Sequence, residues 1–275
     1  MTTIKEWTDC SATLLKNAGI LTPLLDAELL VSEMLGKDRS WLVAHGDDIL
    51  EESLVSTLDS LLSRRCKHEP LAYIRGKQEF YGRDFSVSPD TLTPRPETET
   101  LVECAQNYLN HHPNAQLVSD IGTGSGCIAI SLALDIRNAQ RTFTGYDISA
   151  DALKQAHRNK DAYKASVTFI HADFRTNTSW LNSDLIVANL PYVPNNFHIN
   201  LAASHEPSIA LFGGDNGLDY YTSLFTLCGA RSVRPKAIIT ESLPTQHQLL
   251  ESIARKNGYK LTLTSDFIQQ FENIN

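Results

Sequence analysis

The fold of this chain is decided by the segment Leu117-Val118-Ser119-Asp120-Ile121-Gly122-Thr123-Gly124-Ser125-Gly126. Its first half, 117–121, is typical of a buried strand, and we expect a helix to follow over 128–135. Glycine permits unusual backbone angles and a close approach to the main chain, and the start of a helix adds exposed N–H groups. The segment therefore predicts a strand–turn–helix unit that holds a nucleotide-like cofactor.

The spacing of the glycines narrows the choice of cofactor. The dinucleotide pattern G-x-G-x-x-G requires glycine at position 127, where this chain has Cys127. A spacing of G-x-G-x-G suits a ligand that lacks a pyrophosphate. The turn is therefore not a clean fingerprint for a nicotinamide dinucleotide.

Strands and helices alternate from residue 115 onward. Besides the first unit, strands are expected at 142–147, 167–172, 185–189, 237–241 and 259–264, and helices at 150–163, 220–227 and 246–257. This alternation favours an α/β fold with a parallel, doubly wound sheet. Ligands of such sheets bind at the carboxyl ends of the strands, where the glycine turn also lies.

The first 75 residues have a different pattern. Leucine and other apolar residues recur at helical spacing in 24–35 and again in 48–63, without a β-rich run between them. This pattern predicts a small helical N-terminal domain over 1–75, which we expect to dock a protein substrate.

Aromatic residues among glycine and polar residues mark the next segment. The sequence of 76–96 is typical of a β-hairpin linker. A helix is expected over 99–109, and Thr98 is a candidate for its N-cap. We therefore expect the second domain to occupy 97–275.

Composition excludes several classes of protein. The 275 residues carry a net charge of −8, which disfavours stable, non-specific binding of nucleic acid. The five cysteines are scattered without a CxxC or Cys/His cluster, so we expect no metal site and a reducing compartment. No apolar run is long enough for a membrane span, and no signal sequence is evident. These observations indicate a soluble, cytoplasmic protein.

Two aspartates follow the next strands of the expected sheet. Asp147 ends the strand after the glycine turn, where a carboxylate can accept hydrogen bonds from ribose hydroxyls. Asp173 follows the third strand and can accept from an adenine amine, with Phe174 packing on the base. Each aspartate can instead simply cap the next helix. Together with Gly122, Thr123, Gly124, Ser125 and Gly126, they make S-adenosylmethionine the cofactor that we expect.

The tetrapeptide Asn189-Leu190-Pro191-Tyr192 follows the strand expected at 185–189. A planar –NH₂ group is a poor nucleophile, and an enzyme can help by holding both N–H bonds with fixed acceptors. Asn189 offers a side-chain carbonyl, Leu190 a backbone carbonyl in the extended conformation that a following proline favours, and Tyr192 an aromatic face. The alternative is a rigid strand-to-loop turn without a catalytic role. Methyl transfer to an amide or aromatic amine nitrogen is the function that these residues favour.

Several motifs together resemble one family, the peptide chain release factor glutamine methyltransferases (HemK/PrmC). The resemblance covers nearly the whole chain and rests on segments 64–65, 69–74, 80–85, 92–99, 120–126, 189–192 and 206–207. The most specific is Leu92-Thr93-Pro94-Arg95-Pro96-Glu97-Thr98-Glu99. The resemblance implies a Rossmann-like class I methyltransferase domain, joined by the hairpin linker to the helical domain.

The resemblance also implies a reaction and roles for residues. The reaction is methylation of the glutamine amide in the Gly-Gly-Gln motif of class-1 release factors. Residues 122–126 and Asp147 would hold S-adenosylmethionine, and Asn189 would touch both cofactor and substrate. Leu190, Pro191 and Tyr192 would line the glutamine pocket, with Asn189, Pro191 and Tyr192 as catalytic residues. We expect the protein to act as a monomer.

The chain departs from the family pattern at three places. Leu190 replaces the first proline of the usual Asn-Pro-Pro-Tyr, which makes the motif similar to that of adenine dimethyltransferases of ribosomal RNA. Phe174 stands where many relatives have tryptophan. The final strand, before Asn275, looks truncated or diverged. Two alternatives to methylation of the release factor therefore stay open: methylation of a glutamine in a ribosomal protein and methylation of adenine in RNA.

Weaker signals have two interpretations each. The cluster Arg64, Arg65, Lys67 and His68 is typical of a solvated helix face or of interdomain ion pairs, and less so of a contact with the release factor or nearby RNA. Arg95 either shapes the substrate entrance or holds the linker in place. His198 and His205 are interpreted as loop residues, and the glycines of 211–215 as residues needed for chain geometry.

Overall fold

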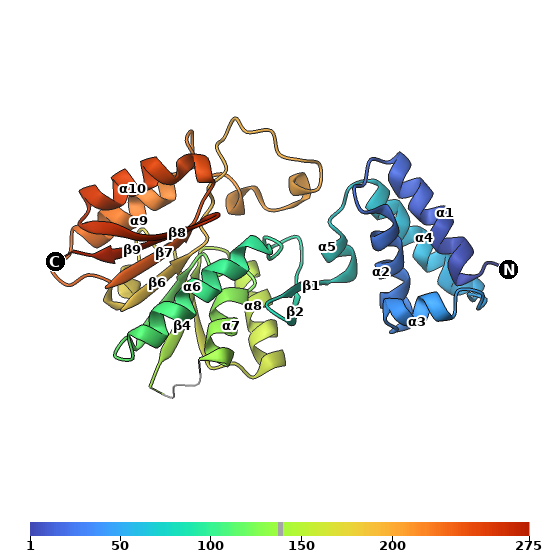
Figure 1. Cartoon of the computed structure of the whole chain (residues 1–275), viewed down its shortest axis with the longest axis horizontal. Coiled ribbons are helices and arrows are strands. Elements are labelled where there is room, and N and C mark those ends of the chain that lie inside the picture. The colour runs from blue at the N-terminus through green and yellow to red at the C-terminus, as the bar shows by residue number, and fades with distance from the viewer. Residues whose placement is uncertain (137–139, 275) are drawn as a thin grey trace. The chain divides into compact units, whose positions relative to one another are not determined.

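The chain is described by a computed structural model over residues 1–136 and 140–274, and its internal contacts divide it into two units (Figure 1). The first unit comprises 1–76 with 199–205, and the second comprises 77–198 with 206–275. The first unit thus ends one residue beyond the helical domain expected from the sequence. The hairpin that we expected as a separate linker falls within the second unit.

The first unit is a bundle of helices around an apolar core. Its helices are α1 (Ile4–Asn17), α2 (Pro23–Leu35), α3 (Arg39–Ala44), α4 (Glu52–Cys66) and α5 (Leu71–Arg75). The side chains of Leu15, Leu30 and Leu58 are fully buried in that core. The start of α1 is fixed by a capping box between Thr3 and Glu6, which satisfies two N–H groups that a helix end leaves free.

The basic cluster near the end of α4 is held by ion pairs inside the first unit. Arg64 donates through Nε to Glu69 at 2.8 Å, and Arg65 through Nε to the buried carboxylate of Asp26 at 2.7 Å. These arginines are therefore committed to partners inside the first unit, whereas the sequence interpretation had placed such ion pairs between domains.

Within the second unit, a buried asparagine links the hairpin to the glycine turn. Strands β1 (Lys77–Phe80) and β2 (Arg83–Ser86) are antiparallel and joined by Tyr81 and Gly82, both at positive φ. The Asn159 side chain accepts from Ser86 N at 2.8 Å and donates to Ser125 O at 2.9 Å. Asn159 therefore ties the hairpin directly to the glycine turn.

A seven-stranded sheet forms the centre of the second unit, in the order β5-β4-β3-β6-β7-β9-β8. Its strands are β3 (Leu117–Ile121), β4 (Thr142–Asp147), β5 (Val167–His171), β6 (Leu185–Ala188), β7 (Ala237–Glu241), β8 (Tyr259–Ser265) and β9 (Ile268–Asn273). From β5 to β7 all neighbours are parallel, as the alternation of strands and helices predicted.

The C-terminal strand β9 corrects the sequence interpretation. We expected the final strand to be truncated or diverged, but β9 is formed over Ile268–Asn273 and pairs antiparallel with both β7 and β8. Its pattern was hidden because Gln269 and Gln270 stand between Ile268 and Phe271, and Gln269 is itself buried. A buried glutamine interrupts the apolar signal without preventing the backbone from pairing.

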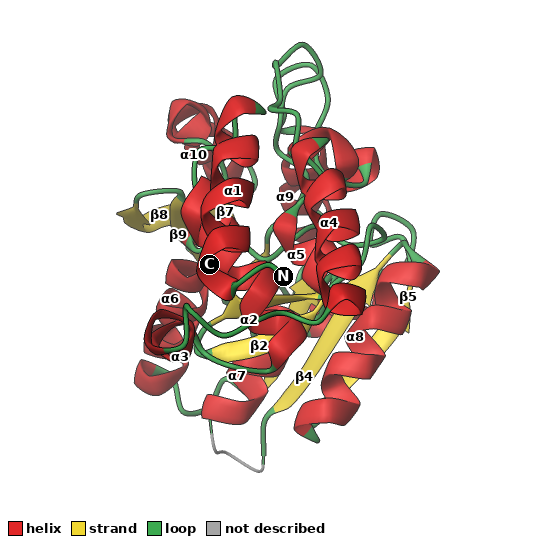
Figure 2. Cartoon of the chain, turned by 90° about the vertical axis from the view of Figure 1, so that its right-hand side faces the viewer, coloured by secondary structure: helices red, strands yellow, loops and turns green. Residues whose placement is uncertain are grey.

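Helices cover both faces of the sheet (Figures 1 and 2). They are α6 (Glu97–His111), α7 (Cys127–Asp135), α8 (Ala150–Tyr163), α9 (Asp219–Gly229) and α10 (His247–Lys256). Alternate residues of β6 enter different cores: Leu185 and Val187 pack with α6 and α7, whereas Ile186 and Ala188 pack with α9 and α10. Such alternation follows from the two-residue period of a strand.

The start of α6 differs from the sequence prediction. The helix begins at Glu97 with Pro96 at the N-cap, so Thr98 lies inside the first turn and is not the cap. The Thr98 side chain is buried and accepts a hydrogen bond from Asn189, far along the chain. The cap interpretation was wrong because this tertiary partner takes the hydroxyl.

We predict that shortening the buried Phe271 side chain of β9 destabilises the second unit. Phe271 is fully buried and its ring packs edge-on against Phe225 at 5.2 Å between centroids. Phe271→Ala should lower the free energy of unfolding by roughly 3–5 kcal/mol, because it removes buried apolar surface and leaves a cavity. Denaturant unfolding followed by circular dichroism measures this change. Ile274→Ala, at a side chain exposed beyond the strand, serves as control, and equal effects of the two would contradict an internal β9.

Candidate active site

A pocket opens at the carboxyl ends of the parallel strands of the second unit. Its empty space is about 1100 Å³ when the solvent-open mouth is included. It is lined by the segment 90–95 with Thr98, the turn 121–125, residues 146–149, residues 172–175, Asn189–Pro191 and residues of 207–210 with Tyr220. The structure thus brings together residues 122–125 of the glycine turn, both aspartates and three residues of the acceptor tetrapeptide, whereas Gly126 is not among the residues that line the pocket.

The glycine turn presents bare backbone to the pocket. Gly122, Gly124 and Gly126 all have positive φ, between 56° and 80°. The amides of Gly122 and Thr123 both donate to Tyr146 O, at 2.8 and 3.0 Å, which fixes the turn against β4. A Cβ at Gly124 would meet no atom within 4 Å, so this glycine faces open space. The turn therefore leaves room for a cofactor at its surface, and it fits the S-adenosylmethionine expected from the sequence.

Asp120, at a buried position of β3, supports the glycine turn through a hydrogen bond. Its Oδ2 accepts from the Thr123 hydroxyl at 2.6 Å, and its Oδ1 is buried without a hydrogen-bond partner. Burial raises the pKa of Asp120 to about 7, although the Thr123 hydrogen bond opposes the shift. This carboxyl supports the turn but does not line the pocket.

Asp147 stands in the pocket with its carboxylate oriented by the backbone. Oδ2 accepts from Gly124 N at 2.8 Å, and Oδ1 accepts from Ser149 N at 2.8 Å. Burial raises the pKa of Asp147, and these N–H donors oppose the shift. The N-cap of α8 is Ser149, so Asp147 is not the helix cap of the alternative interpretation. Each oxygen keeps a further lone pair, which suits hydrogen bonds from a diol.

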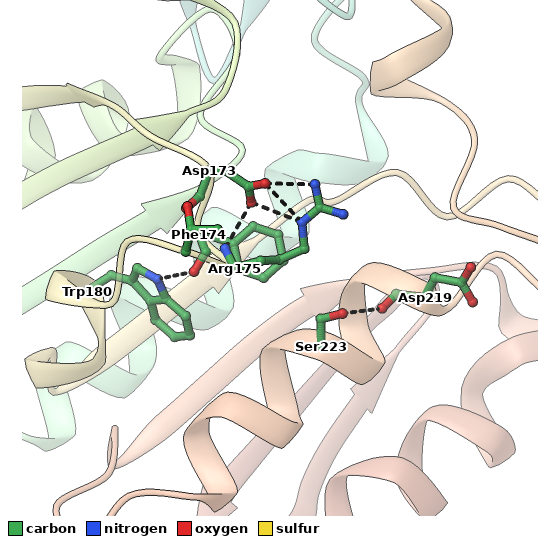
Figure 3. A network of polar contacts seen from close by, with 7 residues as sticks. Asp173, Phe174, Arg175, Trp180, Asp219 and Ser223 are labelled. Atoms are coloured by element: carbon green, nitrogen blue, oxygen red, sulfur yellow. Dashed lines mark hydrogen bonds and ion pairs between the residues drawn. The ribbon is translucent and has the colours of Figure 1, made fainter.

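Asp173 and Phe174 have partners within the protein (Figure 3). Asp173 accepts the Arg175 guanidinium on both oxygens, at 3.0 Å from Nε and 2.8 Å from Nη2, and Arg175 N as well. Arg175 lowers the pKa of Asp173. The Phe174 ring packs edge-on against Trp180, whose Nε1 donates to Phe174 O at 2.9 Å. Both residues line the pocket, but an adenine amine would share Asp173 with Arg175.

Asn189 and Thr98 meet at the floor of the pocket. The Asn189 Nδ2 donates to Thr98 Oγ1 at 3.1 Å, and both residues line the pocket. Because the amide nitrogen is engaged, the carbonyl oxygen Oδ1 is the end that stays available for a ligand. The acceptor role of Asn189 stays a prediction, for which this oxygen is available.

Leu190 is fixed by a fully buried tyrosine. Its N–H donates to Tyr221 Oη at 3.1 Å, and its carbonyl lies 3.5 Å from the same oxygen. The Tyr221 hydroxyl makes its shortest contact with the Glu241 carbonyl, so its one proton is committed there. The Leu190 carbonyl therefore keeps acceptor capacity. The Leu190 side chain would lie 3.1 Å from a Cβ at Gly122, so the two turns are packed together.

Tyr192 differs in position from the other three residues of the tetrapeptide. It is not among the residues that line the pocket. Its hydroxyl donates to Glu241 Oε1 at 2.9 Å, and its carbonyl accepts from Gln246 Nε2 at 2.8 Å. Burial and the neighbouring Glu241 raise the pKa of Tyr192 well above its usual range. Tyr192 thus anchors the tetrapeptide behind the pocket.

The glycines of the following loop pack against the same tetrapeptide. A Cβ at Gly213 would lie 2.2 Å from Pro191 O, and one at Gly217 would lie 2.0 Å from Tyr192 O. Only glycine permits such an approach of two backbones. The interpretation of these glycines as residues of chain geometry agrees with these distances.

Arg95 is paired with a buried carboxylate at the pocket wall. Its guanidinium forms an ion pair with Glu206, whose side chain is almost fully buried. Glu206 Oε1 also accepts from Thr93 N at 3.3 Å. Arg95 and Pro207 both line the pocket, so one ion pair fixes the segment 93–95 and also shapes the entrance.

Sequence reasoning missed several residues of this site. Thr98 was seen only as a cap, and Tyr221 and Gln246 carried no signal because their partners lie far away in the sequence. Glu241 could have been found, since it is a carboxylate at the end of an apolar strand, the pattern that identified Asp147. Over residues 1–136 and 140–274, no group of His, Cys, Asp and Glu is placed to hold a metal ion. No helix in these ranges is long and apolar enough to cross a bilayer.

The sheet order, the glycine turn and the pocket at the strand ends define a Rossmann-like methyltransferase. Two family models match the chain in agreement with this class. The model described as the PrmC N-terminal domain matches residues 6–76, and the model described as the methyltransferase small domain matches 97–206.

Curated relatives narrow the class to a family. The chain is 39% identical over 225 residues to the release factor glutamine methyltransferase of Geobacter sulfurreducens, covering 80% of this chain and 76% of that protein. It is 37% identical over 231 residues to that of Nitratidesulfovibrio vulgaris, covering 82% and 77%. The chain belongs to the release factor glutamine methyltransferase (HemK/PrmC) family.

Other similarities are more limited. The chain is 35% identical to a bifunctional methyltransferase of Rickettsia bellii over 79% of its own length but only 44% of that protein. Among solved structures, the catalytic domain of hMettl16, in complex with a MAT2A 3′UTR hairpin, gives a TM-score of 0.54. At 12% identity, with 80% of this chain and 81% of that chain covered, this similarity shows the fold alone.

We predict that a methyl group at Gly217 disrupts the acceptor tetrapeptide. Gly217→Ala would force the Tyr192 carbonyl away, and a displacement of this size should lower methyl transfer on the order of tenfold to a hundredfold. Gly36→Ala is the matched control, because Gly36 also has positive φ but faces open space in the first unit. Turnover measured for both variants is the test, and equal losses would contradict a specific effect at the tetrapeptide.

We also predict that Asp120 makes stability depend on pH. Its pKa in the folded protein is about 7, above the ordinary 3.8, so the folded state binds more protons over this range. Stability should therefore fall as the pH rises from about 4 to about 7, by roughly 4 kcal/mol at most. Asp120→Asn should remove this dependence. Urea unfolding at pH 5 and pH 8 provides the comparison, and an unchanged difference in the variant would refute the assignment.

Proposed function

We propose that this protein transfers a methyl group from S-adenosylmethionine to the side-chain amide nitrogen of the glutamine in the Gly-Gly-Gln motif of class-1 release factors. The single observation that carries the proposal is the position of Asn189: its amide nitrogen is engaged by Thr98, which leaves its carbonyl oxygen for a substrate N–H. Membership of the release factor glutamine methyltransferase family supports the choice of substrate.

The glycine turn and Asp147 are the residues that would hold the cofactor. Gly124 brings bare backbone to the pocket, and Asp147 offers oxygens that the backbone has already oriented for ribose hydroxyls. Asp173 and Phe174 line the opposite part of the pocket and suit the adenine, with Asp173 shared between the base and Arg175. When bound, S-adenosylmethionine supplies an electrophilic methyl group on its sulfonium.

The acceptor tetrapeptide prepares the amide nitrogen for attack. Asn189 Oδ1 and the Leu190 carbonyl hold the two N–H bonds and so set the direction of the nitrogen lone pair. Positioning of this kind can supply several kcal/mol of the reduction in the barrier. The apolar side chains of Leu190 and Pro191 exclude water from one wall of the pocket. The open mouth of the pocket lets solvent take the proton that the amide nitrogen releases.

Two other substrates could accept a methyl group by the same chemistry. A glutamine in a ribosomal protein presents the same amide, and adenine presents a planar –NH₂ group to the same pair of acceptors. The pairing of Arg64 and Arg65 with internal carboxylates and the net charge of −8 both disfavour RNA. We further propose that the enzyme works as a monomer in the cytoplasm, since its substrates are found there.

We predict that the purified enzyme adds one methyl group to the Gly-Gly-Gln glutamine of a release factor, and that Asn189→Ala strongly slows this transfer. Loss of one fixed acceptor should lower turnover on the order of a hundredfold, while cofactor affinity changes little. Peptide mass spectrometry locates the methyl group, and calorimetry with S-adenosylhomocysteine measures the affinity.

Controls separate the possible substrates. A release factor with the motif glutamine replaced by asparagine should stay unlabelled, because the amide no longer reaches the acceptors. Ribosomal proteins and RNA are offered in parallel reactions. Labelling of either one in preference to the release factor, by an enzyme that binds the cofactor, would overturn the assignment of substrate.

A further inference from the structure

Asp173 and Arg175 form a bidentate ion pair, and both residues line the pocket (Figure 3). Arg175 Nε donates to Asp173 Oδ1 at 3.0 Å, and Arg175 Nη2 donates to Asp173 Oδ2 at 2.8 Å. The backbone N–H of Arg175 donates to the same Oδ1 at 2.9 Å. Paired bonds of this kind fix the relative orientation of the two groups as well as their separation.

The ion pair keeps one acceptor and one donor for a ligand, on neighbouring atoms. A carboxylate has about four acceptor positions, and Arg175 occupies two on Oδ1 and one on Oδ2. Nε also lies 3.2 Å from Oδ2, as the weaker branch of the bond that it makes to Oδ1. Among residues 1–136 and 140–274, Asp173 is the hydrogen-bond partner of Arg175 Nη2, which has two N–H bonds and so keeps one. The remaining lone pair of Oδ2 and the remaining N–H of Nη2 thus belong to atoms 2.8 Å apart.

Tyr220 contacts the guanidinium of Arg175 from another element, near the start of α9. The guanidinium carbon lies over the Tyr220 ring, 5.4 Å from its centroid. A cation is attracted to an aromatic face at this distance. The Tyr220 ring also lies 6.4 Å from the Phe174 ring, and both residues line the pocket. Arg175 is therefore held by both Asp173 and Tyr220, although its side chain is 45% exposed.

The charges of this ion pair give it a fixed hydrogen-bonding pattern. Arg175 lowers the pKa of Asp173, which therefore stays a carboxylate and can only accept hydrogen bonds. The guanidinium of Arg175 can only donate them. An exposed ion pair adds little to stability, so the position of this one in the pocket points to a role in binding. The pair suits a ligand that presents a donor directly beside an acceptor.

We propose that Arg175 is a specificity-determining residue that donates to N1 of the adenine of S-adenosylmethionine, while Asp173 accepts from the N6 amine. Adenine presents these two groups next to each other on its Watson–Crick edge. Hypoxanthine has a 6-oxo group beside an N1–H, so it presents the reverse pattern and would meet like groups at both positions. The guanidinium thus takes part in recognition of the base and does not merely compete for Asp173. The inference rests on the proposed function, because the adenine belongs to the cofactor.

The test compares three ligands by calorimetry, without a methyl acceptor. S-adenosylhomocysteine is the reference, its 1-deaza analogue has a C–H in place of N1, and S-inosylhomocysteine carries the 6-oxo base. The wild type should bind the 1-deaza analogue on the order of tenfold more weakly than the reference, because a hydrogen bond from a charged group is lost. It should bind S-inosylhomocysteine on the order of a hundredfold more weakly, because both positions are mismatched. Equal affinity for all three ligands would overturn the proposal.

Variants of Arg175 separate its role from that of Asp173. Arg175→Met keeps an unbranched side chain without the guanidinium, and should weaken the binding of S-adenosylhomocysteine on the order of tenfold. It should bind the 1-deaza analogue within about threefold of S-adenosylhomocysteine, because no donor to N1 remains to be lost. Arg175→Lys keeps the charge but not the planar fork, and should behave as Arg175→Met does. A tenfold preference for N1 that persists in Arg175→Met would assign this recognition to another group and refute the role of Arg175.

Arg255→Met is the matched control. Arg255 is exposed and forms an ion pair with Glu251 on α10, and neither residue lines the pocket. The same change of side chain there should leave the affinities for all three ligands unaltered. A loss of affinity in Arg255→Met equal to that in Arg175→Met would show a general effect of removing an exposed ion pair and contradict the proposal.

Binding and methyl transfer together separate this inference from the proposed function. If the wild type bound the three ligands in the expected order but methylated no release factor, the proposed substrate would fail while the recognition of adenine was supported. If it methylated a release factor but bound the 1-deaza analogue as tightly as S-adenosylhomocysteine, the inference about Arg175 alone would fail.

Discussion

The backbone of Asn189–Tyr192 is fixed by hydrogen bonds and close contacts with residues that do not line the pocket. The geometry of the acceptor groups in the pocket depends on this constraint. The Tyr221 hydroxyl accepts from Leu190 N–H, Gln246 Nε2 donates to the Tyr192 carbonyl, and the backbone of 213–217 packs against the carbonyls of Pro191 and Tyr192. A buried polar group must find a partner, and here each partner comes from an element of the rigid α/β core. The Asn189 carbonyl oxygen is left free beside the pocket, where we propose that the substrate amide binds.

Local signals in the sequence were sufficient for most of the fold and for half of the site. Strands β3, β4 and β7 have the bounds that the sequence predicted, and β7, which is buried at every position, has the mostly apolar sequence expected of a strand covered on both faces. Asp147 and the glycine turn were found for a related reason. A polar or glycine residue directly after such a run lies at the edge of the sheet where ligands bind.

Residues that act through distant partners could not be predicted in this way. Thr98 looked like a helix cap because its neighbours in the sequence form a helix, whereas its partner lies 91 positions away. Strand β9 was missed because a glutamine occupies a buried position, and Asp173 was not expected to share its carboxylate with Arg175. In each case a tertiary contact overrides the local preference, and a single sequence does not contain that contact.

At Leu190, a hydrogen bond restrains the backbone where many relatives have the ring of a proline. Where relatives commonly have proline, the ring restricts φ but provides no N–H. Leucine leaves φ free, yet its N–H reaches Tyr221, and its side chain fills the space beside Gly122. The hydrogen bond from Leu190 N–H to the Tyr221 hydroxyl thus restrains the backbone here, as the proline ring does in relatives. With proline at position 190, the Tyr221 hydroxyl would lose the N–H that it accepts and keep only the carbonyl groups to which it can donate, so a change at residue 190 would leave a buried acceptor at residue 221 without its donor.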